Sequence, residues 1–213
     1  MAEFAQTERN SITRLPKRAV YDKEVVYAIL DEALFCTLAF VRGNEPCQIP
    51  TGFCRIGDKL YVHGSVGSTY MRELAEKRGA VCVSATLIDG LVLARSAFHH
   101  SVNYRSVVAF GVAERVSDEQ EQYLALESFT NKMQPGRWND VRKPTAGEWK
   151  ATLVLSVYIE EASAKIRTGS PKDDDEDYAL DIWAGVVPLQ IQRQGPVPDP
   201  LLREGIVKPG YLK

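Results

Sequence analysis

The stretch LYVHGSVGSTYMREL, Leu60 to Leu74, combines residue types that can bind an anion. A strand-like segment runs into a helical pattern through a turn rich in glycine and hydroxyl groups. The first amides of a helix have no partner inside the helix and lie at the positive end of its dipole, which suits a phosphate. Ser and Thr are also ordinary helix caps, so both interpretations stay open. The candidate anion-binding residues are Gly64, Ser65, Ser68, Thr69 and Arg72.

A second polar stretch, AFHHSVNYRSVVAFGVAERV from Ala97 to Val116, leads into a predicted strand. Arg105 offers fixed donors for carbonyl or phosphate oxygens, and the ring of Tyr104 can stack on a flat ligand. Adjacent side chains of an extended chain point in opposite directions, so at most one of His99 and His100 should face a site. The alternative is a polar loop whose arginine pairs with an acid.

Other motifs offer little catalytic chemistry. Trp183, beside Ala184 and Gly185, could stack on an aromatic ligand, although a tryptophan in a strand is more often core. There is no Ser/His/Asp or Cys/His arrangement, no carboxylate pair in an apolar context and no glycine-rich phosphate loop. Four cysteines lack a CxxC pair, and no metal site is expected. This pattern favours a cofactor that brings its own chemistry.

Size and composition indicate one ordinary globular domain. The chain has 213 residues, of which 45% are hydrophobic and 25% charged, with a formal net charge of −2. This charge gives no reason to expect nucleic acid or an anionic membrane as a partner. The polar N-terminus lacks a secretory signal pattern, so a cytoplasmic location is expected. A single domain over residues 1–213 is predicted, with an extended arm at 1–22, a charged loop at 171–178 and a proline-rich tail at 194–213.

Hydrophobic periodicity predicts a mainly β protein with peripheral helices. An antiparallel barrel with helices outside it fits this order better than a nucleotide-binding doubly wound sheet. Residues 134–149 are expected to form a loop. Helices are predicted at 22–34, 68–79 and 117–133, and strands at 35–42, 47–56, 59–65, 80–95 with a break near Asp89-Gly90, 106–116, 151–169 and 179–193.

The segments LYVHGS, HHSVNYRSVV and WAGVVP, in this order, resemble the pyridoxamine 5′-phosphate oxidase-related proteins. These are FMN-binding split barrels, and the most similar branch includes the nitroimidazole-resistance reductases. The resemblance extends over roughly 13–189 and implies a six-stranded antiparallel split barrel. It also implies a homodimer with FMN at the subunit interface. The implied flavin contacts are Tyr61, Val62, His63, Ser65, Ser68, Thr69, Tyr104, Arg105 and Ser106.

The chain departs from the vitamin-phosphate oxidases themselves. Their turn carries Ser-Arg-Lys where this chain has Ser68-Thr69-Tyr70, so a true pyridoxamine 5′-phosphate oxidase is not expected. The leading hypothesis is an FMN-dependent oxidoreductase that reduces a small organic acceptor such as a nitroaromatic or a quinone. Because histidine titrates near neutral pH, His63, His99 and His100 are the candidate proton donors. A non-catalytic flavin carrier or sensor and a haem-binding split barrel are the alternatives.

Overall fold

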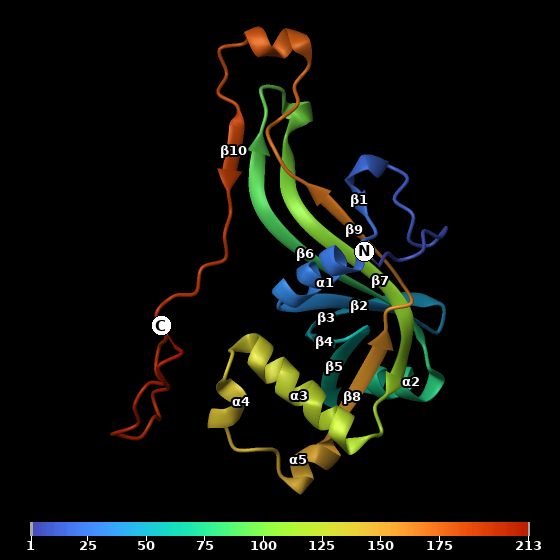
Figure 1. The fold of residues 1–213 in the computed structure, drawn as a ribbon, viewed down its shortest axis with the longest axis vertical. Helices are drawn as coiled ribbons and strands as arrows, with labels where there is room; N and C mark the ends of the chain where they lie inside the picture. Colours follow the sequence, from blue (N-terminus) through green and yellow to red (C-terminus); the bar gives the residue numbers. More distant parts are fainter. Residues whose placement is uncertain (1, 213) are drawn as a thin grey trace.

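The computed structural model describes residues 2–212 and contains ten strands in one antiparallel sheet (Figure 1). The strands are β1 (Ala19–Val20), β2 (Phe35–Arg42), β3 (Glu45–Gly52), β4 (Cys54–Ile56), β5 (Lys59–Ser65), β6 (Ala80–Leu93), β7 (Ser101–Arg115), β8 (Thr152–Tyr158), β9 (Glu161–Arg167) and β10 (Gly185–Pro188). The helices are α1 (Lys23–Glu32), α2 (Thr69–Lys77), α3 (Glu119–Met133), α4 (Arg137–Asp140) and α5 (Ala146–Ala151), with short 3-10 helices η1 (Pro16–Arg18), η2 (Ala97–His99) and η3 (Asp175–Ala179).

The barrel is built on two long curved strands, β6 and β7, which pair along most of their length. Beyond the barrel they extend as a two-stranded arm, and β10 pairs with β6 there (Figure 1). β6 runs unbroken through the predicted break near Asp89-Gly90, where the pairing only shifts register between Ile88 and Gly90. The other edge of β7 pairs first with β9, up to Phe110, and then with β8, from Ala113.

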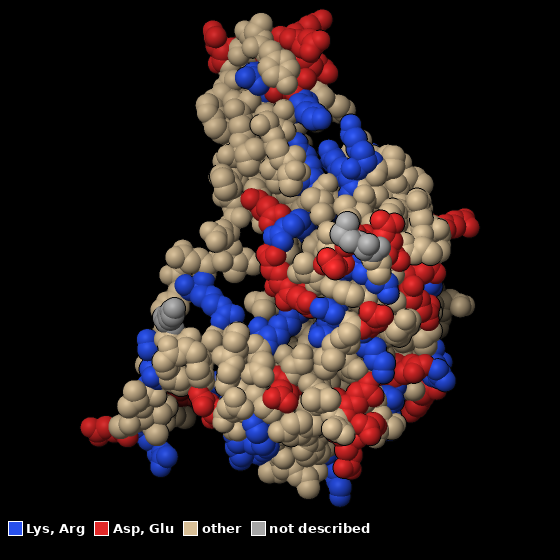
Figure 2. All heavy atoms as spheres, in the orientation of Figure 1, with Lys and Arg blue, Asp and Glu red and all other residues tan. Residues whose placement is uncertain are grey.

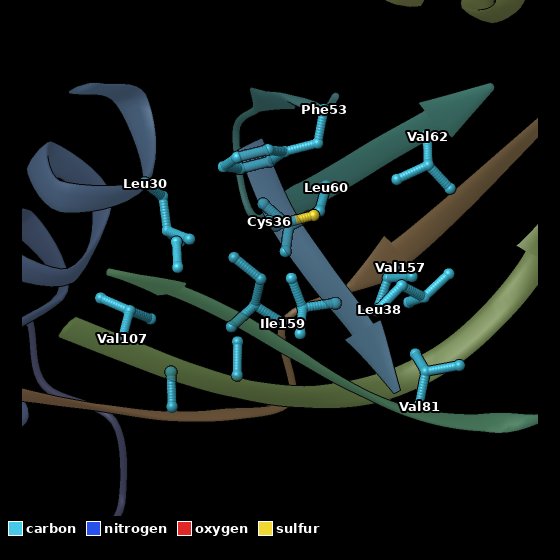
Figure 3. Packing of buried hydrophobic residues seen from close by; sticks show 14 of the residues in the cluster. Leu30, Cys36, Leu38, Phe53, Leu60, Val62, Val81, Val107, Val157 and Ile159 are labelled. Carbon is cyan, nitrogen blue, oxygen red and sulfur yellow. The ribbon is translucent and has the colours of Figure 1, made fainter. Parts of the chain in front are cut away.

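The remaining strands complete the barrel in the order β3-β2-β6-β7-β8-β5-β4. β3 and β4, the two end strands of this order, are not paired with each other. They are joined directly by the chain through the single residue Phe53. Apolar side chains from facing strands fill the interior, and α1 adds Leu30 to the same cluster. Figure 3 shows Leu38, Val81 and Val157 meeting in this core.

The predicted antiparallel barrel is confirmed, but the prediction of six strands is wrong. Two segments predicted as single strands are divided: residues 47–56 break at Phe53, and the long strand after Ala151 breaks after Tyr158. The chain turns there because the amide of Ile159 donates to the carbonyl of Asp58 at 2.9 Å rather than to a strand partner. β1 and β10 add two short pairings at the periphery.

Capping residues set the helix boundaries. The Asp22 side chain accepts hydrogen bonds from two amides of the first turn of α1, as its predicted N-cap role requires. The prediction of a loop over residues 134–149 is wrong, because this segment contains α4 and the start of α5. Thr145 and Glu148 form a reciprocal capping box that begins α5. At the end of α2, Arg78 rather than Gly79 adopts the left-handed conformation.

The N-terminal arm packs on the barrel. Phe4 is buried and packs edge-on against Tyr27 of α1, with ring centroids 6.0 Å apart. The C-terminal segment after β10 instead runs beside the molecule toward α4 (Figure 1), and most of its side chains are exposed. None of the helices in residues 2–212 has the length and apolar character needed to cross a membrane.

Substituting Gly111 tests the point where β7 changes partner. A Cβ at this position would lie 2.1 Å from the carbonyl oxygen of Tyr158, and this backbone atom cannot rotate away. We expect Gly111→Ala to lower the free energy of unfolding by about 3 kcal/mol, measured by urea denaturation. Gly195→Ala, where nothing lies within 4 Å, is the matched control and should change it by less than about 0.5 kcal/mol. Equal effects of the two substitutions would contradict a steric role for Gly111.

Candidate functional site

The turn between β5 and α2 has the form of an anion site. The Gly67 amide donates to the Ser65 hydroxyl at 3.0 Å, and the Ser68 amide donates to the Ser65 carbonyl at 2.9 Å. Ser68 occupies the N-cap position, but its side chain makes no capping hydrogen bond. The Ser68 hydroxyl and the first amides of α2, beginning at Thr69, are therefore available to an anion.

Two arginines lie beside this turn. Arg72 and Arg115 line a hollow of about 220 Å³ together with Val66, whose carbonyl accepts from Arg72 Nη1 at 3.2 Å. Neither guanidinium makes an ion pair with a carboxylate of residues 2–212. Glu76 is the carboxylate among the lining residues of this hollow. The region therefore offers cationic donors next to the N-terminus of α2, and Arg115 is a residue that the sequence prediction missed.

Strand alternation divides the β5 residues between two environments. Val62 points into the barrel core (Figure 3). Tyr61 and His63 face α3 on the outside of the barrel, where the Tyr61 hydroxyl donates to the Glu121 carboxylate at 2.7 Å. Burial and this carboxylate raise the pKa of Tyr61 above its usual value. The three residues predicted to run along a flavin thus do not share a face.

His63 packs against α3. Its ring meets the ring of Phe129 edge to face, with centroids 4.5 Å apart. Burial lowers the pKa of the His63 imidazole below 6.5, which keeps the ring neutral at pH 7. No hydrogen bond joins the ring to another of residues 2–212. A neutral imidazole offers a lone pair, so this residue suits proton acceptance or metal ligation better than proton donation.

Arg105 is held by two carboxylates. It forms a bidentate pair with Asp89, at 2.9 and 2.8 Å, and a second pair with Glu32 of α1. Arg105 lowers the pKa of both carboxyls. Within one chain, Arg105 therefore has the alternative role predicted from the sequence, in which it pairs with an acid. Nearby, the Ser106 hydroxyl donates to the Lys165 carbonyl at 3.3 Å, and Tyr104 is half-buried on β7.

The remaining predicted residues lie at the far end of the β6–β7 arm (Figure 1). His99 ends η2, and Nδ1 of His100 lies 3.0 Å from the Ser96 carbonyl oxygen. Trp183 lies between η3 and β10 and is 67% exposed. The structure therefore does not bring His99 or His100 next to His63 within one chain.

An acidic cluster meets His99 at the tip of the arm. Nε2 of His99 lies 3.2 Å from Asp174 Oδ2, and with Asp177 these potential metal ligands lie within 4.8 Å of one another. The cluster joins the charged loop to a histidine far away in the sequence, so residue spacing could not reveal it. Asp173, beside it, pairs with Arg95 at 3.1 Å. The absence of a metal site stays a prediction.

This antiparallel barrel, with a serine-rich turn between β5 and α2, is the fold of the split-barrel proteins. Residues 22–166 match the family model described as pyridoxamine 5′-phosphate oxidase. The chain belongs to this family. No curated protein shows a significant sequence match.

Solved structures agree with this assignment. The chain is 39% identical to the flavocytochrome Anf3 from Azotobacter vinelandii, with a TM-score of 0.90 over 97% of this chain and 95% of that one. It is also 39% identical to the FAD and heme binding protein from Mycobacterium smegmatis, with a TM-score of 0.86 over 91% and 95%. A Bacteroides thetaiotaomicron protein named for 5-nitroimidazole antibiotic resistance shares the fold at 20% identity, with a TM-score of 0.59 over 70% and 86%.

The stability lost when the Arg105 network is broken should depend on pH. Carboxylates with lowered pKa values stabilise the folded state above their unfolded pKa near 4, and this contribution is lost as the pH falls through the folded value. We expect Arg105→Gln to lower the free energy of unfolding by ~1 kcal/mol at pH 7, since the pairs are only partly buried, and to have little effect at pH 2.5. Arg142→Gln, which breaks a solvent-exposed pair with Glu148, is the control and should cost less. An Arg105→Gln effect that is the same at both pH values would contradict the ionic origin.

Proposed function

We propose that this chain is a flavin-binding redox protein that works as a homodimer. The observation that carries the proposal is the uncapped N-terminus of α2, with Ser65, Ser68 and Thr69 beside the unpaired Arg72. These groups fit the phosphate of a flavin nucleotide. The two 39%-identical relatives, described as a flavocytochrome and as an FAD and heme binding protein, support the same cofactor class. When bound, the flavin would supply hydride or electron transfer.

Exposed apolar surface supports the homodimer. In the segment after β10, Ile191 and Val197 are 84% and 90% exposed, and on the barrel Phe35 is 65% exposed. Between this segment and the barrel lies a hollow of about 580 Å³ that Phe35, Arg105 and Ile191 help to line. Figure 2 shows the opening between the C-terminal segment and the body. Large apolar side chains that are exposed together usually mark an interface, and a second copy of the chain would cover these.

The small number of acid and base groups near the proposed flavin site bears on the choice of electron acceptor. Among the described residues that line the hollow beside the α2 turn, Glu76 is the single carboxylate, so the protein would mainly position the flavin. We propose a small organic acceptor such as a nitroaromatic or a quinone, reduced directly by the flavin. A carrier or sensor without a dedicated acceptor is the competing function. Rapid reoxidation of the reduced protein by one of these acceptors supports an enzyme, whereas uniformly slow reoxidation supports a carrier.

A charge placed at the α2 turn tests the phosphate site. Asp is as good an N-cap as Ser, so Ser68→Asp should leave the helix intact while its carboxylate repels a phosphate. We expect FMN and FAD to bind at least about tenfold more weakly, while riboflavin, which has no phosphate, is unaffected. Isothermal titration measures all three ligands.

Ser68→Asn is the matched control, because asparagine caps equally well without a charge. It removes the Ser68 hydroxyl without adding charge, so it should weaken FMN and FAD binding less than Ser68→Asp does and leave riboflavin binding unchanged. Unchanged FMN and FAD affinities in Ser68→Asp would place the phosphate elsewhere. An unaltered protein that binds no flavin would overturn the proposed function.

Haem is a second candidate ligand, and His63 is the observation that favours it. Its neutral, half-buried imidazole is a suitable axial donor, and both 39%-identical relatives are described with haem or as a flavocytochrome. The donor fits, but the space does not, because the gap between β5 and α3 at His63 has no room even for a water molecule. Haem at this position would require α3 to move away from β5.

Reconstitution with haem tests this second candidate. Haem held by His63 requires a Soret band in the unaltered protein and its loss in His63→Ala, because the iron would lose its axial imidazole. His100→Ala, at the tip of the arm, is the control and should keep the band. Phe129→Ala should speed haem uptake, since it removes the ring packed against His63. A Soret band that persists in His63→Ala would exclude this residue as the ligand.

A further inference from the structure

The tip of the β6–β7 arm carries large apolar side chains that are exposed to solvent. This arm tip consists of the turn 94–100, which contains η2, and of the segment 170–184, which contains η3. Phe98 is 88% exposed and Trp183 is 67% exposed, and between them in the sequence Tyr178, Leu180 and Ile182 are exposed as well. Exposed aromatic side chains gathered in one place usually mark an interface. Neither the proposed phosphate site nor the haem candidate uses them.

The segment that contains η3 is fixed on the arm tip and makes its surface acidic. Asp173 accepts hydrogen bonds from the amides of Arg95, at 2.9 Å, and Ser96, at 3.3 Å. The Arg95 guanidinium pairs with the same carboxylate, and β10 then returns along β6. The carboxylates that this arrangement leaves exposed are those of Asp174, Asp175 and Glu176. The arm tip is therefore a preformed surface of acidic and aromatic side chains.

A basic cluster lies at the other end of the arm, where it leaves the barrel. Arg167 is the last residue of β9 and the register partner of Tyr104 on β7. Lys165 is on the same face of β9, since side chains two residues apart in a strand point the same way. The pairing of Ala19 with Lys165 brings η1 to this place. Figure 2 shows basic side chains here and acidic side chains at the arm tip. The basic cluster consists of Lys17, Arg18, Lys165 and Arg167.

The positive charge of the basic cluster is not compensated within the chain. Arg167 is only 7% exposed, and its guanidinium donates to neutral oxygens: the Asn103 side chain and the carbonyls of Gly169 and Ser170, the latter two at 3.3 Å each. Burial lowers the pKa of Arg167, and the nearby charge of Arg18 lowers it further. None of the four cations makes an ion pair with a carboxylate of residues 2–212. Cations in this setting gain from carboxylates that another molecule brings.

The arm tip and the basic cluster complement each other in charge but cannot meet within one chain. The paired strands of the arm hold them at its opposite ends (Figure 1). A two-fold axis across the arms of two copies reverses one arm relative to the other, so each tip then meets the base of the partner's arm. The same contact forms twice in such a pair. A second copy of the chain therefore carries the complement of both surfaces.

We propose that the arm tip of each subunit docks on the basic cluster of a second copy, an inference that rests on the proposed homodimer. Asp175 and Glu176 of one copy then face Lys17 and Arg18 of the other. The exposed aromatic side chains of the tip are buried in the same contact. Charge complementarity fixes the direction of the two arms, because a parallel arrangement would place tip against tip and like charge against like charge.

Charge reversal on the two surfaces of the full chain tests this docking. The cluster variant combines Lys17→Glu with Arg18→Glu, and the tip variant combines Asp175→Lys with Glu176→Lys. We expect each variant to dimerise at least about tenfold more weakly than the unaltered protein, because like charges then face each other. An equimolar mixture of the two variants should recover most of the lost affinity, since both contacts of the mixed dimer join opposite charges. Sedimentation equilibrium at low salt measures the dissociation constants.

Two further substitutions complete the design. Lys77→Glu combined with Lys150→Glu changes the net charge as the cluster variant does, but on α2 and α5, away from the arm, and should leave the dissociation constant unchanged. Phe98→Ser removes an exposed ring from the tip and should weaken dimerisation, whereas Val41→Ser, at an exposed position of β2, should not. Because so exposed a side chain adds little to the stability of one chain, Phe98→Ser decides the test if a charge variant does not fold, which circular dichroism shows.

Two results would overturn the docking while leaving the proposed homodimer intact. One is a dissociation constant that neither charge variant nor Phe98→Ser changes, which would assign the arm tip to a different partner. The other is a mixture that dimerises no better than its two components, because the two surfaces would then not face each other. An unaltered protein that stays monomeric at all concentrations overturns the proposed homodimer, and this inference with it.

Discussion

The close approach of β7 to the end of β8 is the constraint on which the rest of the structure depends. β7 pairs with β6 along one edge, but its other edge must serve β9 and then β8. Between these two partners the Tyr158 carbonyl lies so near Gly111 that no side chain fits. Because β7 changes its partner from β9 to β8 at this point, one strand pairs with both halves of the barrel. It also brings the end of β7, with Arg115, beside β8 and the α2 turn.

The barrel wall separates two chemical environments through strand alternation. On β5, Val62 faces the apolar core, while Tyr61 and His63 face α3 outside it. α3 therefore controls access to the outer face of β5. The same helix contributes Tyr123 to the hollow between α3 and α5, so a shift of α3 would alter both places.

Local signals made much of the fold predictable. Asp22 before an apolar period predicted α1, and β2 has the predicted boundaries, because both depend on neighbouring residues. The helix α5 was missed although Thr145 and Glu148 have the capping-box spacing. The division between β8 and β9 could not be seen, because the turn is set by a hydrogen bond to Asp58, which is far away in the sequence. Contacts of that kind leave no local pattern.

The same distinction holds for the candidate site. The α2 turn is contiguous in sequence, so its hydroxyl groups could be recognised from the order of the residues alone. The electrostatic potential at the turn could not be recognised in this way, because it depends on which arginines form ion pairs with carboxylates in the folded chain. Arg105 is neutralised by Asp89 and Glu32, so within one chain it adds little positive potential for a bound anion. Arg72 and Arg115 have no such partners in the described chain, and they flank the helix N-terminus. Positive charge that folding leaves uncompensated, rather than the number of basic residues, is therefore what favours an anion at this turn.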